Sequence, residues 1–176
     1  ERLESGVLTL RRNEKDFLAR KDLKYLDRFQ GNVAKLSANF NDVEQKIIEY
    51  GIDLPEVKQF EMAYTAYADK FNALVDFQKK IGLHPKDGYY GELRAAVHEV
   101  ETQLKEQSSY QLLADMLQLR RAEKDFMLRR DVKYLDKFET NLSTFYEHLT
   151  SASLDGNAKQ SIRSGLGVYE QRFKQL

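Results

Sequence analysis

The chain has 176 residues, of which 41% are hydrophobic and 32% are charged, so it combines an apolar core with a large solvated surface. This ratio suits narrow helical bundles, whose surface is large for their volume. Lys and Arg number 28, as do Asp and Glu, so no net positive field favours nucleic acid or an anionic membrane. Cysteine is absent, which excludes disulfides and thiol catalysis. The chain contains no run of about 20 apolar residues, so the sequence predicts no membrane span within it.

Helical periodicity runs through nearly the whole chain, which has only two prolines and nine glycines to interrupt it. We expect a first helix over residues 1–50, about 75 Å long at a rise of about 1.5 Å per residue. Its apolar residues recur at alternating spacings of four and three, which predicts a seam against partner helices: Phe29, Val33, Leu36, Phe40, Val43 and Ile47. Gly51 suits the end of this helix, and Asp53 suits the N-cap of the next.

A second helix is expected to end near Ile81, before "GLHPKDG", and a third to cover residues 89–107. The apolar register fails at Ser108–Ser109, where we place a turn. One continuous helix of about 60 residues is the alternative, because no Gly or Pro enforces a break there. A fourth helix is expected over residues 110–149, and a fifth follows "TSASLDGN".

The chain contains an internal duplication. "LRRNEKDFLARKDLKYLDRF", residues 10–29, returns as "LRRAEKDFMLRRDVKYLDKF", residues 119–138, with fourteen of twenty positions identical. The second and fifth helices also correspond at a constant offset of 102, matching Phe60, Tyr67, Phe71 and Leu74 with Ile162, Tyr169, Phe173 and Leu176. The third helix has no counterpart after the second copy. The chain therefore reads as five-sixths of a six-helix arrangement.

Short turns make neighbouring helices antiparallel. The helix lengths then predict an all-α fold of two stacked four-helix-bundle modules that share the two long helices, with the final short helix missing. The distal module would cover residues 30–125, and the incomplete proximal module would combine residues 1–29 with residues 126–176. We interpret the sequence as a fragment of a longer chain, because both ends read as helix interior.

Several charged residues of the repeat fall on the predicted seam. Burying a lone charge costs several kcal/mol, so each needs an opposite charge, water or a bound anion. For the aspartates we favour ion pairs where the long helices cross. The four aspartates are Asp16, Asp22, Asp125 and Asp131, with Asp22 facing Arg129 or Arg130 and Asp131 facing Arg20 or Lys21.

The arginine doublets have fewer acids nearby. Each doublet has a single acid within one helical turn, Glu14 or Glu123. A guanidinium that faces a bundle interior beside Tyr hydroxyls is a bidentate receptor for a carboxylate, and plain surface charge is the alternative. We predict a proximal site of Arg11, Arg12, Tyr146 and Tyr169, and a distal site of Arg120, Arg121, Tyr67 and Tyr64.

The sequence offers little support for catalysis. His84, His98 and His148 are far apart and form no metal-binding pair, and neither a Gly-rich phosphate loop nor a nucleophile elbow occurs. We therefore expect neither enzymatic activity, nor a cofactor, nor a metal site.

The paired pattern "RRxEKDFxxRxDxKYLxxF" on two long helices resembles the helical bimodular sensor domain of bacterial methyl-accepting chemotaxis proteins and sensor kinases. The resemblance covers essentially the whole chain apart from the final helix. It implies a periplasmic ligand-binding domain of an inner-membrane chemoreceptor, with transmembrane helices outside this sequence and a homodimeric state. It also implies recognition of small organic acids such as C4-dicarboxylates, citrate or acetate by arginines of the long helices.

Other functions remain open. The sequence also fits the sensor domain of a histidine kinase, or a spectrin-like structural repeat that binds no small molecule. A metal-carboxylate enzyme is a third alternative. Which acid is bound, and by one module or both, is not specified by the sequence.

Overall fold

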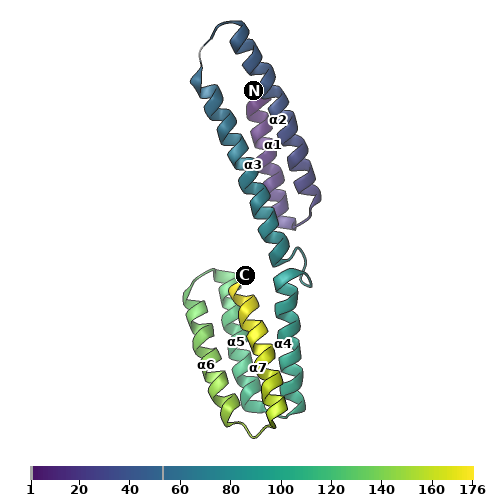
Figure 1. Cartoon of the computed structure of the whole chain (residues 1–176), viewed down its shortest axis with the longest axis vertical. Helices are drawn as coiled ribbons and strands as arrows, with labels where there is room; N and C mark the ends of the chain where they lie inside the picture. The colour runs from purple at the N-terminus through teal and green to yellow at the C-terminus, as the bar shows by residue number, and fades with distance from the viewer. Residues whose placement is uncertain (1, 53) are drawn as a thin grey trace. The chain divides into compact units, whose positions relative to one another are not determined.

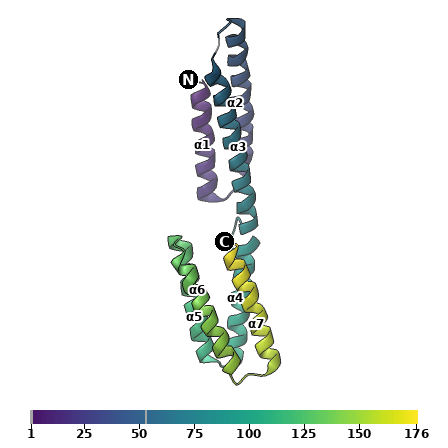
Figure 2. The same ribbon diagram turned by 60° about the vertical axis from the view of Figure 1, so that its left-hand side comes forward.

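The computed structural model describes residues 2–52 and 54–176 (Figures 1 and 2). Regular structure in the described residues is entirely α-helical, which confirms the all-α prediction. The helices are α1 Arg2–Arg20, α2 Lys24–Glu49, α3 Pro55–Ile81, α4 Gly88–Glu106, α5 Tyr110–Arg129, α6 Lys133–Ser151 and α7 Gly156–Lys174. Glu1 and Asp53 lie outside the described residues, and with Asp53 lies the helix cap that we expected there.

The chain folds as two compact units, Glu1–His84 and Pro85–Leu176. In the N-terminal unit, α1 and α2 form an antiparallel hairpin and α3 packs along it (Figure 2). In the C-terminal unit, α5 and α6 form the equivalent hairpin and α4 pairs with α7 (Figure 1). The predicted modules instead join residues 1–29 to residues 126–176, and this grouping stays a prediction.

The two predicted long helices are each interrupted. The expected continuous helix over residues 1–50 is wrong, because α1 ends at Arg20 and α2 begins at Lys24. The expected helix over residues 110–149 is likewise wrong, because α5 ends at Arg129 and α6 begins at Lys133. The predicted turn at Ser108–Ser109 is confirmed, since α4 ends at Glu106 and Ser108 has a φ of 51°.

Both interruptions have the same backbone geometry. Lys21 and Arg130 each adopt a φ of 54°, in the left-handed region that side-chain-bearing residues rarely occupy. The following aspartate restarts the helix, because its Oδ1 atom accepts a hydrogen bond from the backbone N–H two residues later. This bond is 2.9 Å long from Lys24 to Asp22 and 3.0 Å long from Lys133 to Asp131. The duplicated sequence therefore encodes a helical hairpin.

The aspartates pair locally and not across the chain as we expected. Asp22 forms an ion pair with Lys24 at 2.8 Å, and Asp131 forms one with Lys133 at 2.9 Å. Hydrogen bonds from these lysines lower the pKa of both exposed carboxyls. Asp125 pairs with Arg129 at 3.5 Å, one helical turn away. The prediction of crossed pairs is wrong for Asp22, Asp125 and Asp131, because each of these three has a nearer partner within its own hairpin.

The aromatic core repeats with the sequence. Phe29 and Phe71 have ring centroids 4.2 Å apart at 39°, and their counterparts Phe138 and Phe173 lie 4.3 Å apart at 39°. Phe29, Phe71, Phe138 and Phe173 are all buried. The hairpin with its Tyr-x3-Phe helix is thus the structural repeat, formed by α1–α3 in one unit and by α5–α7 in the other.

We expect Arg130→Gly to raise the free energy of unfolding by about 1 kcal/mol, because glycine adopts the left-handed conformation without the steric cost of a side chain. Lys21→Gly should act in the same direction. Urea unfolding followed by circular dichroism measures both effects.

The matched control is Arg129→Gly, one residue earlier at the last position of α5, which should lower stability because glycine is a poor helix former and the ion pair with Asp125 is lost. A continuous helix through this region would make both substitutions destabilising, and that result would contradict the hairpin.

Candidate ligand-binding site

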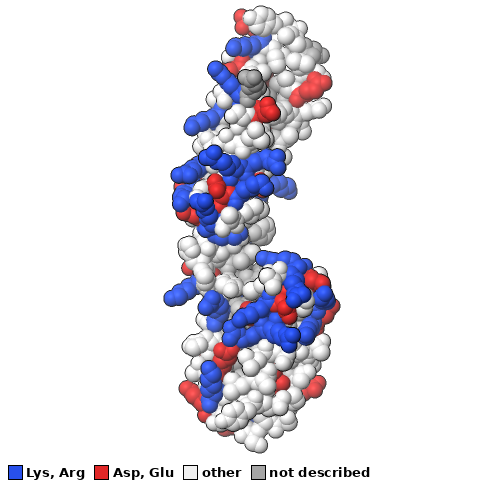
Figure 3. Space-filling view, turned by 180° about the vertical axis from the view of Figure 1, so that it is seen from behind, with Lys and Arg blue, Asp and Glu red and all other residues white. Residues whose placement is uncertain are grey.

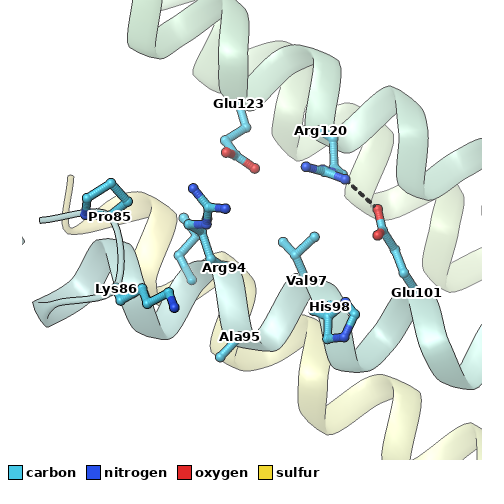
Figure 4. Close-up of a pocket in the computed structure, with 11 residues that line it drawn as sticks. Pro85, Lys86, Arg94, Ala95, Val97, His98, Glu101, Arg120 and Glu123 are labelled. Atoms are coloured by element: carbon cyan, nitrogen blue, oxygen red, sulfur yellow. Dashed lines mark hydrogen bonds and ion pairs between the residues drawn. The ribbon is translucent and has the colours of Figure 1, made fainter.

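A cavity of about 460 Å³ opens in the C-terminal unit between the start of α4 and the middle of α5. This volume is within the range of small-molecule sites, about 300–1,000 Å³. Its charged and titratable lining comprises Lys86, Arg94, His98, Glu101, Arg120 and Glu123, and Figure 4 shows these side chains around the cavity. The cavity therefore includes Arg120, one of the predicted distal residues.

Arg120 is held at the cavity wall by α4. Its Nη1 atom donates a 2.8 Å hydrogen bond to Oε1 of Glu101, drawn as the dashed line in Figure 4. Burial lowers the pKa of the guanidinium, but the hydrogen bond and charge of Glu101 outweigh burial and raise that pKa. The Nε atom of Arg120 is buried and has no hydrogen-bond partner in the described structure. An unsatisfied buried donor costs about 1–3 kcal/mol, so this N–H favours an acceptor from a ligand or from water.

Glu123 and Tyr169 form a buried polar pair beside Arg120. The Tyr169 hydroxyl is fully buried and donates a 2.6 Å hydrogen bond to Oε2 of Glu123. Burial raises the pKa of Glu123, despite the opposing effects of the Tyr169 hydrogen bond and the Arg120 charge. Burial also raises the pKa of Tyr169. Glu123 is thus a carboxyl whose negative charge the cavity stabilises poorly.

Lys86 and Arg94 add unpaired positive charge to the same cavity. Both side chains are exposed, and neither hydrogen-bonds or forms an ion pair with a described residue. Arg94 points toward Glu123 in Figure 4, and its charge acts against the burial of that carboxyl. With Arg120, the lining offers three cations against two carboxylates, one of which resists ionisation. The cavity therefore favours an anionic ligand.

The predicted distal residues belong to both units. Arg120 lines the cavity, whereas Arg121 is exposed and lines a separate shallow hollow with Lys124. Tyr64 and Tyr67 belong to the N-terminal unit. Tyr64 is buried there against the rings of Phe40 and Phe60.

The predicted proximal residues likewise belong to both units. Tyr169 is the buried partner of Glu123, in the repeat of Arg120. Tyr146 is half-buried, which raises the pKa of its hydroxyl, and its ring lies beneath Arg163 at 5.0 Å. Arg11 and Arg12 are exposed on α1, and Arg11 lies near Tyr67, whose hydroxyl donates to Glu14. Each repeat thus has an arginine and, three residues later, a glutamate that lie near the tyrosine of the same repeat: Arg11 and Glu14 near Tyr67, and Arg120 and Glu123 near Tyr169.

Cationic residues gather around both hairpin turns. Residues 11–28 contain seven Lys and Arg against four Asp and Glu, and residues 120–137 contain the same numbers. Figure 3 shows these blue side chains crowded together within each unit. The chain as a whole is neutral, so the remaining residues carry a net negative charge. Such a local positive field raises the concentration of anions near the cavity.

Three charged residues of the lining were not predicted from the sequence, namely Lys86, Arg94 and Glu101. Arg94, His98 and Glu101 recur at spacings of four and three on α4, which places them on one helix face. This spacing is the signal in the sequence that marks them as neighbours. Lys86 has no comparable signal because it lies in the turn before α4.

The described residues contain no group of three or more His, Asp or Glu that could hold a metal ion. Comparisons with protein-family models, with curated proteins and with solved structures find no match to this chain.

We expect Glu123→Gln to change the pH dependence of stability. The folded wild type binds a proton at Glu123 more tightly than the unfolded chain does, because its folded pKa is raised. Acidification from neutral pH toward the ordinary value of 4.5 should therefore stabilise the wild type relative to Glu123→Gln. Urea unfolding of both proteins across this range measures the difference, in which the effects of all other carboxyls cancel.

Tyr169→Phe is the companion variant. It removes a hydrogen bond that lowers the Glu123 pKa, so its stability should depend on pH more steeply than that of the wild type. Parallel pH profiles for all three proteins would contradict the assignment of Glu123 as a buried carboxyl with a raised pKa.

Proposed function

We propose that this chain is the ligand-binding domain of a bacterial transmembrane chemoreceptor that recognises small organic acids. The observation that carries the proposal is the cavity in which Arg120, Arg94 and Lys86 converge. Lys86 and Arg94 form no hydrogen bond or ion pair among the described residues, although Arg94 lies over the Tyr90 ring, and Arg120 has an unsatisfied Nε donor. A carboxylate supplies two acceptor oxygens and a negative charge, which meets both requirements at once.

A dicarboxylate or tricarboxylate fits the cavity better than a monocarboxylate. The cations come from different segments, Arg120 from α5 and Arg94 from α4, with Lys86 in the turn before α4. One carboxylate bound to Arg120 leaves Arg94 and Lys86 for a second. The volume of about 460 Å³ accommodates a four-carbon or six-carbon acid. His98 supplies an additional donor at the cavity wall.

The proposal includes a periplasmic location, a homodimeric state and anchoring by helices outside this sequence. None of the described helices combines the length and apolarity needed to cross a membrane. The resemblance of the duplicated segment to bacterial sensor domains supports the location. A sensor domain of a histidine kinase would use the same cavity.

We retain the two-module arrangement with shared long helices as a proposed second state of the domain. It requires Lys21 and Arg130 to move from the left-handed region into the helical region, where each helix becomes continuous. Removal of the left-handed strain favours this change, and loss of the Asp22 and Asp131 caps opposes it. A ligand would shift the two states only by its difference in affinity for them.

A thermal-shift screen of malate, succinate, citrate, acetate and glycine tests the function. An acid at about 100 times its Kd stabilises the folded state by about 2.7 kcal/mol, which is an increase in Tm of about 5–10 °C for a chain of this size. We expect a dicarboxylate or tricarboxylate to give this shift. Arg120→Ala and Arg94→Ala should each abolish it.

Arg121→Ala is the matched control, because Arg121 is exposed and does not line the cavity. Its thermal shift should equal that of the wild type. The proposed site is wrong if Arg121→Ala removes the response, or if Arg120→Ala and Arg94→Ala keep it. If no acid stabilises the wild type, the structural repeat without a ligand is the better interpretation.

A further inference from the structure

The two units contain the same three-helix repeat, but only the C-terminal unit has a fourth described helix. In the C-terminal unit α4 packs against α7, whereas within the N-terminal unit no described helix occupies the equivalent position on α3. The contacts between α4 and its neighbours therefore provide a template for the uncovered surface. Each residue of α7 that contacts α4 corresponds to the residue of α3 that lies 102 positions earlier in the sequence. Each residue of α5 that contacts α4 corresponds to the residue of α1 that lies 109 positions earlier.

In the C-terminal unit, α4 approaches α7 closely at small residues. A Cβ atom on Gly165 would lie 2.6 Å from Cγ2 of Val100, so glycine permits the approach. Polar contacts flank this point: Gln103 donates to Ser161 at 2.8 Å, and Arg172 donates to Glu92 at 2.5 Å.

The same surface on α3 is exposed and largely apolar. The counterparts of Gly165 and Val168 are Ala63 and Ala66, and the counterpart of Arg172 is Lys70. The exposed face of α3 defined by this correspondence consists of Gln59, Met62, Ala63, Ala66, Lys70, Ala73, Leu74 and Phe77. We call this set the outer face of α3. Met62 is 72% exposed and Phe77 is 66% exposed, which is unusual for large apolar side chains on one stripe.

Residues of α1 next to this face are less buried than their counterparts on α5. Leu112 and Met116 are buried to 1% and 0% exposure in the C-terminal unit, whereas their counterparts Leu3 and Val7 are only half-buried. Arg120 pairs with Glu101 of α4, whereas its counterpart Arg11 is exposed and has no ion pair with a described residue. The N-terminal unit thus lacks both the apolar cover and the carboxylate that α4 supplies.

We propose that the outer face of α3, together with Arg11, is a docking site for an amphipathic helix of a partner protein, bearing a carboxylate opposite Arg11. The small residues Ala63, Ala66 and Ala73 allow a close helix approach, and Met62 and Phe77 supply apolar area. Lys70 and Arg11 select acidic residues, as Arg172 and Arg120 do with Glu92 and Glu101 of α4.

A second copy of this chain does not fit the site. Among the described helices, α4 supplies the template for this contact, and its apolar residues are already buried in its own unit: Leu93, Ala96, Val97, Val100 and Leu104. Self-pairing of two outer faces would place Lys70 and Arg11 of both copies together, without an acidic residue among the eight that form the face. Like charges at such a contact are repulsive.

A labelled peptide with the sequence of α4, residues 88–106, tests the docking site when titrated into the full chain and followed by fluorescence anisotropy. We expect saturable binding. Ala66→Arg should weaken it at least tenfold, because a long cation replaces a small residue at the centre of the face. Thr65→Arg is the matched control on the exposed polar side of α3 and should leave binding unchanged. Circular dichroism verifies that both variants remain folded.

The carboxylate requirement is tested separately. A peptide with Glu101→Gln should bind about threefold more weakly than the parent peptide to the wild-type chain, and equally well to Arg11→Ala. The proposal is overturned if the peptide does not bind, or if Ala66→Arg binds it like the wild type. It is also overturned if sedimentation shows a dimer that Ala66→Arg dissociates, because the face would then be covered by a second copy. Organic-acid binding is independent of these results, since its cavity lies in the C-terminal unit.

Discussion

The left-handed residue followed by a capping aspartate is the constraint on which the rest of the structure depends. Lys21 and Arg130 reverse the chain without a glycine, and Asp22 and Asp131 start the next helix. A residue with a side chain is held in this conformation at a cost of about 1–2 kcal/mol. The packing of the hairpin offsets this cost in each unit, where Phe17 and Phe29 are fully buried in one, and Phe138 is in the other. The hairpin also determines which tyrosine hydrogen-bonds the glutamate of each repeat, Tyr67 with Glu14 and Tyr169 with Glu123.

Much of the fold follows from the sequence alone. The all-helical class, the breaks after Tyr50 and Ile81 and the turn at Ser108–Ser109 follow from periodicity and from glycine and proline positions. The hairpin turns could not be predicted from these signals, because Lys21 and Arg130 are residues with good helix propensity. The available clue was the repeated D-x-K pattern, in which an aspartate side chain caps the N–H two residues later. We assigned those aspartates to long-range ion pairs instead, and this one error produced the two uninterrupted helices.

The candidate site shows the same limit. Arg120 could be identified because a duplicated doublet with few acids nearby is visible in the sequence. Its neighbours could not, since they depend on which helix covers α5. With a continuous fourth helix, Tyr67 was the expected partner, whereas the hairpin gives Tyr169 and Glu123. Arg94 and Lys86 enter only because α4 packs in the same unit as Arg120. A local pattern thus identified the charged group, and only the tertiary fold identified its surroundings.

Glu101 connects the cavity to the packing of α4. Its carboxylate holds Arg120, which is the group that a bound acid would also engage. A ligand that competes for the Arg120 Nη1 donor weakens the Glu101 contact, whereas one that uses the other N–H donors of the guanidinium leaves this contact intact. The ion pair is about one-third exposed on its arginine side, so it is worth at most about 1 kcal/mol. A ligand acting through this contact alone would therefore change the equilibrium of α4 by about fivefold, and a larger response would require Arg94 and Lys86 to bind differently in the two states. Lys86 precedes α4 and Arg94 lies in the first half of α4, so a ligand that bridges them to Arg120 connects this part of the chain to α5. This is the geometry that a larger response needs.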